Sequence, residues 1–97
     1  MTSPGGSWRV SKIASAARRS IRSLDLETQE RILAELEALE RTPFSGDIKR
    51  AKGKKDIFRL RFGCYRLFFR ADFSDRSIEI LLFDKRGAIK DKNVQRL

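Results

Sequence analysis

Histidine is absent from this chain, and cysteine occurs once, at Cys64. A single cysteine excludes an intramolecular disulfide framework. Without histidine and with one thiol, the common zinc and iron ligand sets cannot be assembled. We therefore expect no metal site, and nothing in the sequence indicates a cofactor.

Long apolar runs are also missing. The N-terminus lacks the apolar core of a signal peptide, and no stretch approaches the ~18 consecutive apolar residues of a membrane span. We therefore expect no membrane association and a cytoplasmic location. Residues 1–7, MTSPGGS, are small, polar and glycine-rich, which is typical of a flexible leader. The remaining residues, 8–97, are expected to form a single domain.

Acidic residues are outnumbered, with 13 Asp and Glu against 22 Lys and Arg and a net charge of +9. Residues 1–23 carry five bases and no acid, residues 24–41 carry two bases and six acids, and residues 42–97 carry fifteen bases and seven acids. This distribution predicts one acidic solvated surface and one surface that attracts nucleic acid, an acidic protein or an anionic membrane. A generic basic surface is the alternative interpretation.

The N-terminal half predicts a strand followed by two helices. Trp8–Ile13 alternates as a short strand does, and Ala14–Leu24 places apolar residues at helical spacing with arginines opposite. Asp25 can cap a second helix, whose apolar positions run from Leu26 to Leu39 and include Leu33. Pro43 should end that helix. The short connection predicts an antiparallel helical hairpin that supplies one apolar layer.

Phe44–Lys55 is a lysine-rich connection with two glycines, predicted to lie outside the core. It is either a solvated loop or a basic rim on a nucleic-acid groove. In the second case Lys52, Lys54 and Lys55 would bind RNA, together with Lys90 of the basic tail Lys90–Leu97.

Asp56–Asp72, DIFRLRFGCYRLFFRAD, predicts a hairpin of two alternating strands that turn at Phe62-Gly63-Cys64. One face of the hairpin is apolar and should rest on the helices, and Tyr65 has the parity of this face. The other face carries Arg59, Arg61, Arg66 and Arg70, together with Phe68. We expect Arg59, Arg61 and Arg66 to bind an anion, although a role in solubility is the alternative, and Arg70 to be a surface residue.

A turn at Ser74-Asp75-Arg76 and an apolar strand, Ser77–Phe83, complete the pattern. The order of strand, two helices and three strands predicts an α+β fold, with the helical hairpin packed on one face of a mainly antiparallel sheet.

The chain resembles the RelE/ParE superfamily of toxins from toxin–antitoxin modules. The resemblance covers roughly Trp8–Lys90 and rests on the helical hairpin ending in proline, on Phe58–Phe69 (FRLRFGCYRLFF), and on the strand that runs into Lys85–Lys90 (KRGAIK). The hairpin motif is closer to the RelE-type pattern than to the ParE-type pattern. It implies a RelE-like two-layer sandwich, and a type II toxin that cuts messenger RNA in the ribosome without a metal and is neutralised by an acidic antitoxin.

The same resemblance implies site residues. The functional bases of the family fall on Arg59 and Arg61 of the first hairpin strand, Arg66 of the second, and Arg86 after the last strand. In such toxins the 2′-hydroxyl attacks the adjacent phosphate. Arginine binds phosphate oxygens in bidentate fashion, so these four residues are the predicted catalytic set.

Two positions depart from the family pattern. The first-strand lysines of the family are arginines here, and its C-terminal tyrosine is replaced by Ile89 or Lys90. Because arginine has a pKa above about 12, it is a poor general base, and Arg59 and Arg61 would act electrostatically. Lys54, Lys55 and Lys90 are then the candidates for proton transfer. Two alternatives stay open: a ParE-like inhibitor of DNA gyrase without nuclease chemistry, and an inactive module that binds RNA or the ribosome.

Overall fold

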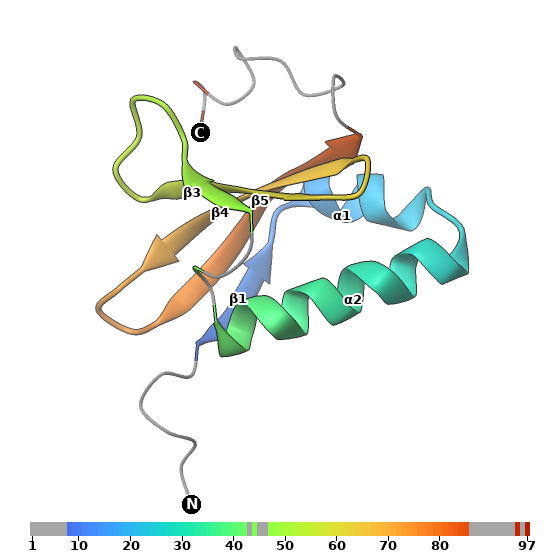
Figure 1. The fold of residues 1–97 in the computed structure, drawn as a ribbon, viewed down its shortest axis with the longest axis horizontal. Helices are drawn as coiled ribbons and strands as arrows, with labels where there is room; N and C mark the ends of the chain where they lie inside the picture. Colours follow the sequence, from blue (N-terminus) through green and yellow to red (C-terminus); the bar gives the residue numbers. More distant parts are fainter. Residues whose placement is uncertain (1–7, 43, 45–46, 86–94, 96) are drawn as a thin grey trace, which may run out of the picture.

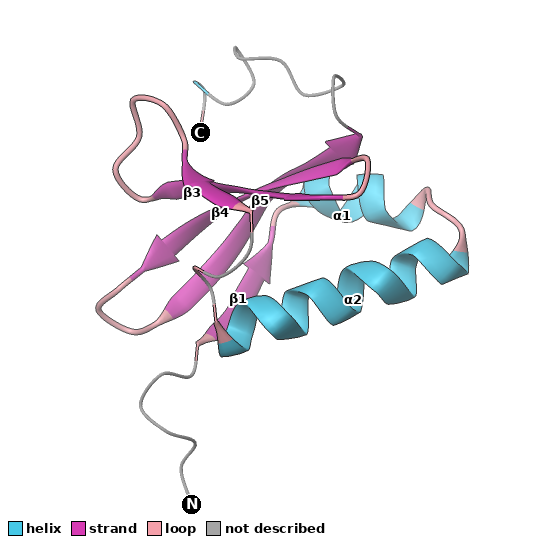
Figure 2. Cartoon of the chain, viewed as in Figure 1, coloured by secondary structure: helices cyan, strands magenta, loops and turns pink. Residues whose placement is uncertain are grey.

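Two helices lie on one side of a five-stranded sheet in the computed structural model (Figure 1), which describes residues 8–42, 44, 47–85, 95 and 97. The described elements are β1 (Arg9–Ile13), α1 (Ser15–Arg22), α2 (Leu26–Arg41), β2 (Ile48–Arg50), β3 (Ile57–Phe62), β4 (Tyr65–Asp72) and β5 (Ser77–Lys85). Figure 2 shows the two layers, with both helices on the same face. The predicted α+β fold is thus confirmed.

The strand order in the sheet is β1-β5-β4-β3-β2. β2, β3, β4 and β5 pair antiparallel to their neighbours, whereas β1 pairs parallel to β5. The predicted hairpin is present, and its register places Phe62 opposite Tyr65. The turn between them needs glycine, because Gly63 has a φ of 57°, a left-handed conformation that is costly for residues with a Cβ atom.

The main core lies between the helices and the sheet, as the alternation of the hairpin predicted. Ala17, Ile32, Leu36 and Leu39 of the helices pack with the apolar side of the strands. Leu67, Phe69, Ile78 and Ile80 are fully buried there, and burying each such side chain contributes about 1.5–3 kcal/mol. The ring of Tyr65 stacks on Phe83 at 5.3 Å on this side of the sheet, which confirms its predicted face.

The predicted cap of α2 is confirmed. The Asp25 carboxylate accepts hydrogen bonds from the Thr28 hydroxyl at 2.6 Å and from the Thr28 backbone N–H at 3.4 Å. The hydrogen bond from the Thr28 hydroxyl is the main reason why the pKa of Asp25 lies below its usual value. Pro43, the predicted helix terminator, lies outside the described residues.

Three expectations about burial were wrong. Leu26 and Leu33, assigned to the apolar stripe of α2, are 77% and 61% exposed, because α2 buries only the narrower stripe of Ile32, Leu36 and Leu39. The connection Phe44–Lys55 is not only a loop: it contains β2, and Ala51 is buried. A segment that joins the edge of a sheet can bury one small residue without an apolar run.

The face of the sheet opposite the helices is not purely cationic. A second apolar cluster lies there, consisting of Ala51, Ile57, Phe68 and Leu81 with Leu82 and Leu97 packed against it. The register of β4 and β5 shifts between Phe68 and Phe69, and such a bulge lets Leu81 and Leu82 share this face while Ile80 and Phe83 face the helices. No described helix is long and apolar enough to cross a membrane.

Candidate anion-binding site

Basic side chains gather on the face opposite the helices because neighbouring strands are in register. Lys49 of β2 pairs with Arg59 of β3, and Arg61 of β3 pairs with Arg66 of β4. Neighbouring strands lie about 4.8 Å apart and alternate residues share a face. These four residues, Lys49, Arg59, Arg61 and Arg66, form what we term the cationic face.

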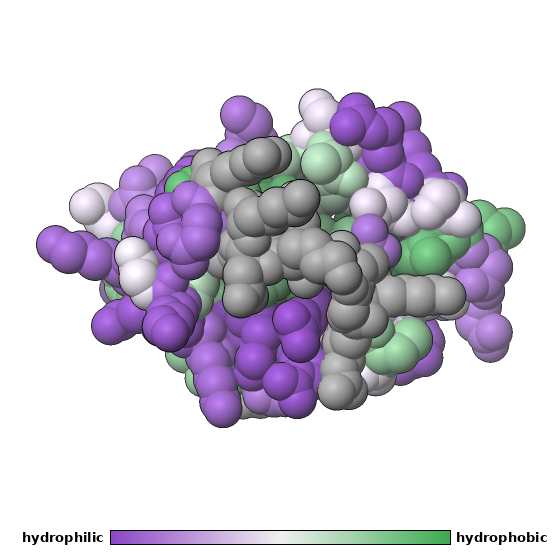
Figure 3. Space-filling model, turned by 90° about the horizontal axis from the view of Figure 1, so that it is seen from above, coloured by the Kyte–Doolittle hydropathy of each residue, from purple (hydrophilic) through white to green (hydrophobic). Residues whose placement is uncertain are grey.

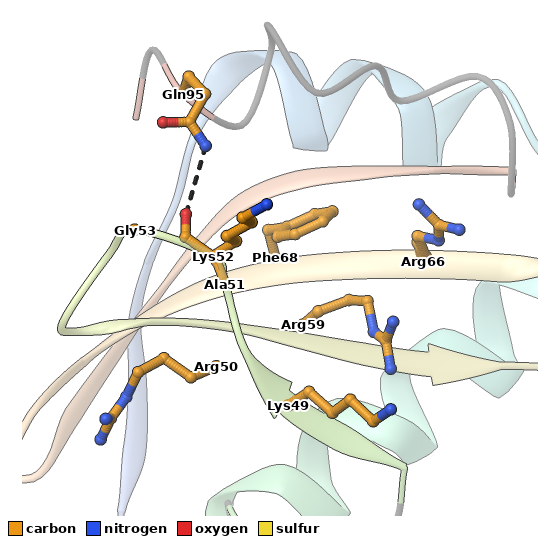
Figure 4. Close-up of a pocket in the computed structure, with 9 residues that line it drawn as sticks. All are labelled: Lys49, Arg50, Ala51, Lys52, Gly53, Arg59, Arg66, Phe68 and Gln95. Atoms are coloured by element: carbon orange, nitrogen blue, oxygen red, sulfur yellow. Dashed lines mark hydrogen bonds between the residues drawn. The ribbon is translucent and has the colours of Figure 1, made fainter.

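A pocket of about 650 Å³ opens beside this face. Figure 4 shows Lys49, Arg59 and Arg66 extending from three adjacent strands, while Gln95 donates a hydrogen bond from its side-chain amide to the Lys52 carbonyl at 3.3 Å. The nine lining residues include five bases and no acid, and Phe68 supplies an apolar floor: Lys49, Arg50, Ala51, Lys52, Gly53, Arg59, Arg66, Phe68 and Gln95. In the space-filling view of Figure 3, hydrophilic residues cover much of the left side and lower centre.

Asp47 is a carboxylate that contacts the cationic face. Its Oδ1 lies 3.4 Å from Arg59 Nη2 and its Oδ2 lies 3.7 Å from Arg61 Nε. The Asp47 side chain is 48% exposed, whereas that of Arg59 is only 16% exposed. One carboxylate therefore joins two of the predicted phosphate-binding arginines. Arg61 lines a smaller cavity of about 250 Å³ together with Asp47, and it is not among the lining residues of the larger pocket.

Arg66 differs from Arg59 and Arg61 in its ion pairing, because those two guanidinium groups contact Asp47. The Nε of Arg66 is buried and has no hydrogen-bond partner within the described chain, a property that the Nε of Arg61 shares. No ion pair of Arg66 is formed with any described residue either. A buried guanidinium nitrogen without a partner is costly, and an anionic ligand that accepts its hydrogen bond would remove this cost.

Arg70 lies on the same strand and the same face but is paired. Its Nε is 3.3 Å from Asp56 Oδ2, and its Nη1 is 3.4 Å from Glu79 Oε1. These two carboxylates offset its charge locally, which agrees with its expected role as a surface residue.

The other predicted residues divide into three groups. Lys52 lines the pocket. The Lys54 ammonium donates to the carbonyls of Gln95 at 3.0 Å and Leu97 at 3.3 Å, which does not favour it as a proton carrier, and Lys55 is exposed and is not a lining residue. Arg86 and Lys90 lie outside the described residues. No group of histidine, cysteine and carboxylate side chains that could hold a metal ion occurs among the residues described.

Three of the lining residues were not predicted from the sequence: Lys49, Arg50 and Gln95. β2 has only three residues, and their order, Ile48-Lys49-Arg50, contains no alternation of apolar and polar residues. Antiparallel pairing of this segment with β3 would have placed Lys49 beside Arg59, and this pairing is the feature that could have identified Lys49.

A family model described as the ParE toxin of the type II toxin–antitoxin system parDE matches residues 11–89 of the chain. The match covers both helices, the strands from β2 to β5 and the second part of β1. The chain belongs to the RelE/ParE superfamily of toxins. It is therefore a toxin of the type II toxin–antitoxin class, and the superfamily predicted from the hairpin motif is confirmed.

Solved structures similar to this toxin come from archaea and bacteria. A chain of the archaeal RelE–RelB complex from Pyrococcus horikoshii is 28% identical, with a TM-score of 0.71 over 86% of this chain and 99% of that chain. A chain of the RelBE2 toxin–antitoxin complex from Mycobacterium tuberculosis is 24% identical, with a TM-score of 0.71 over 84% of this toxin and 99% of that chain. The YoeB/ParE toxin from Agrobacterium tumefaciens is 19% identical, with a TM-score of 0.66 over 81% and 98%. No curated protein matches the sequence.

Proposed function

We propose that this toxin is a ribosome-dependent endonuclease that binds and cuts messenger RNA with its cationic face. The observation that carries the proposal is the composition of the larger pocket, which has five basic lining residues and no acidic one. Most contacts between proteins and nucleic acids go to phosphate oxygens, and arginine binds these in bidentate fashion. The likeness to RelE structures, at 28% identity for the archaeal chain, supports the same proposal.

The proposed reaction needs no metal. The 2′-hydroxyl oxygen attacks the adjacent phosphorus, the bond from phosphorus to the 5′-oxygen breaks, and the products are a cyclic phosphate and a 5′-hydroxyl. The proton leaves the 2′-oxygen for solvent water, and solvent water donates a proton to the departing 5′-oxygen. Arg59 and Arg66 would stabilise the charge that builds up on the phosphate oxygens, with Arg61 beside them. Lys52 would hold the flanking RNA backbone.

Other residues enter this proposal from the sequence alone. Arg86 would act with Arg66 on the phosphate, and Lys54, Lys55 and Lys90 would contact RNA outside the pocket. Replacing one of these lysines should weaken RNA binding to the same degree for every sequence, without altering which sequences are cut.

We further propose that an acidic antitoxin neutralises this toxin. Several similar structures are RelE–RelB or RelBE complexes. A partner with acidic segments would complement a chain with a net charge of +9, and opposite charges accelerate association and favour the correct partner.

The test is inducible expression in bacteria with mapping of RNA 5′ ends. The wild-type toxin should arrest growth and produce new ends within translated frames. Arg66→Ala should reduce cleavage by about 100-fold or more, the loss seen when one charge-stabilising donor is removed. Arg70→Ala is the matched control, since it removes an arginine from the same strand and face that carboxylates already offset. Equal losses from the two variants, with both folded, would refute the assigned role of Arg66.

A second candidate function is inhibition of DNA gyrase, and the match to the ParE toxin model favours it. The same cells decide between the candidates. Intact messenger RNA together with gyrase-linked DNA breaks would establish the second function and exclude the first.

A further inference from the structure

A carboxylate lies directly across from Arg66 in the sheet. Asp84 of β5 pairs with Arg66 of β4, which in turn pairs with Arg61 of β3. Directly opposed residues of an antiparallel pair share a face, and the next pair, Leu67 with Phe83, faces the helices. Asp84 therefore lies on the same face of the sheet as Arg61 and Arg66, and it is exposed. Figure 4 shows Arg66 extending from β4 on the side where β5 lies.

The β-bulge in β5 is the reason why Asp84 reaches this face. Ile80 faces the helices, so strict alternation along β5 would turn Asp84 toward the helices as well. Instead, the register of β4 and β5 shifts between Phe68 and Phe69, which leaves Leu81 as an extra residue in β5. This extra residue reverses the parity of the rest of the strand. Bulges of this kind re-aim side chains and are over-represented beside active sites.

The geometry of this pair suits a reacting group that contacts both side chains. Facing Cβ atoms of an antiparallel pair lie about 4.5–5.5 Å apart, yet Asp84 and Arg66, both in the described part of the chain, form no ion pair with each other. By contrast, Asp47 contacts Arg59 and Arg61 and offsets their charge. A phosphate held by Arg66 would therefore lie next to a carboxylate that is not paired with that arginine.

We propose that Asp84 is the general base of RNA cleavage, an inference that rests on the endonuclease function proposed above. The arginines of the cationic face stay protonated and cannot take a proton from the 2′-hydroxyl. A carboxylate can, and it is a stronger base than water. The proton that leaves the 2′-oxygen for solvent water thus passes through Asp84, while Arg66 stabilises the charge on the phosphate oxygens.

The step balances with one proton passed on. An oxygen of the Asp84 carboxylate takes the proton of the 2′-hydroxyl while the 2′-oxygen bonds to phosphorus and the bond from phosphorus to the 5′-oxygen breaks. Solvent water donates a proton to the 5′-oxygen, and the hydroxide ion that remains takes the proton that Asp84 then releases. A 2′-oxygen poised for attack lies about 3–3.5 Å from phosphorus, which is within side-chain reach of position 84 when Arg66 holds the phosphate.

The test is single-turnover cleavage of messenger RNA on programmed ribosomes, with the full-length toxin in excess. Asp84→Asn, which keeps the shape of the side chain, should slow cleavage by about 100-fold or more, as expected when a general base is lost. Asp84→Glu keeps a carboxylate and should recover most of this loss. Asp75→Asn is the matched control, because it removes the same charge from the turn before β5, and it should cleave at the wild-type rate.

Two further measurements separate a general base from a residue that only positions Arg66. Asp84→Asn should bind a labelled oligouridylate at least as tightly as the wild type in fluorescence anisotropy, because the substitution removes a negative charge beside the cationic face. Formate added to Asp84→Ala should raise the cleavage rate in proportion to its concentration, because a free carboxylate can take over the proton transfer. Chloride at the same ionic strength should have no such effect.

Equal cleavage rates for Asp84→Asn and the wild type would overturn the role of Asp84, and so would a loss of cleavage that matches weaker binding of oligouridylate. A slow Asp84→Ala variant that formate does not accelerate would also overturn it and would identify a positioning residue. In each of these cases the wild type still cuts messenger RNA, so the proposed endonuclease stands. A wild-type toxin that leaves ribosome-bound messenger RNA intact would instead refute the endonuclease, and the role of Asp84 with it.

Discussion

Replacing Asp47 with asparagine should strengthen RNA binding while it weakens the fold slightly. The Asp47 carboxylate pairs with Arg59 at 3.4 Å and with Arg61 at 3.7 Å, so a phosphate must compete with it for both guanidinium groups. Exposed ion pairs contribute about 0.2–1 kcal/mol each, so losing both should cost about 0.5–2 kcal/mol of unfolding free energy.

The gain in binding follows from the same contacts. If the ion pairs of Asp47 cost phosphate binding about 1 kcal/mol of free energy, their removal raises the affinity for single-stranded RNA about fivefold. The freed arginines can also engage one more phosphate, which steepens the slope of log affinity against log salt by about 0.7. Fluorescence anisotropy of a labelled oligouridylate, repeated at several salt concentrations, measures both quantities.

The control for Asp47→Asn is Asp75→Asn, which makes the same change of net charge, from +9 to +10. Asp75 lies in the β4–β5 turn, whereas Arg66 lies near the other end of β4. Seven strand residues span about 20 Å, beyond the Debye length of about 8 Å at physiological salt. Equal affinities for wild type and Asp47→Asn, or equal gains in Asp47→Asn and Asp75→Asn, would refute the competition between Asp47 and phosphate.

Three further predictions concern stability, measured by urea unfolding. Phe69→Ala should cost about 3–5 kcal/mol, because this ring is fully buried in the main core; a cost below 1 kcal/mol would contradict the described packing. Gly63→Ala should cost about 1–2 kcal/mol, because φ at this position is 57°, whereas Gly63→Asn should cost less. Asp25→Asn should destabilise the protein at neutral pH. The pKa of Asp25 is lowered in the folded state from 3.8, so its contribution is complete above that value and is lost as the pH falls through the lower folded pKa. The difference between the wild type and Asp25→Asn should therefore shrink in acid, and a difference that persisted there would point to a cause other than the carboxylate charge.

The hairpin and the position of its arginines could be predicted because strand alternation acts over neighbouring residues. Arg59 and Arg61 share a face for that reason, and the register of the hairpin places Arg66 opposite Arg61 on the same face. The same rule places Arg70 beside them, and only its neighbours across the sheet, Asp56 and Glu79, set it apart.

What could not be predicted depends on contacts between distant parts of the chain. β2 is held by pairing with β3 and has no apolar pattern of its own. Phe68 lies among arginines in the sequence, and it is buried only because Ala51 and Leu81 reach the same face. Leu33 has the same helical spacing as buried residues, yet it lies at the margin of the layer, which periodicity cannot specify.

The parallel pairing of β1 with β5 determines when the sheet can be completed during folding. Ser11 bonds to the carbonyl of Ile78, 67 residues along the chain, and β5 lies between β1 and β4 in the sheet. Pairings of such long range form late, because closing the intervening loop costs entropy before any contact repays it. During synthesis β1 cannot pair until β5 has been made, which lies 67 residues further along the chain at the contact of Ser11 with Ile78. A chain that ends before Ser77 would therefore lack the strand that lies between β1 and β4 in the sheet, so neither of these strands could complete its pairing.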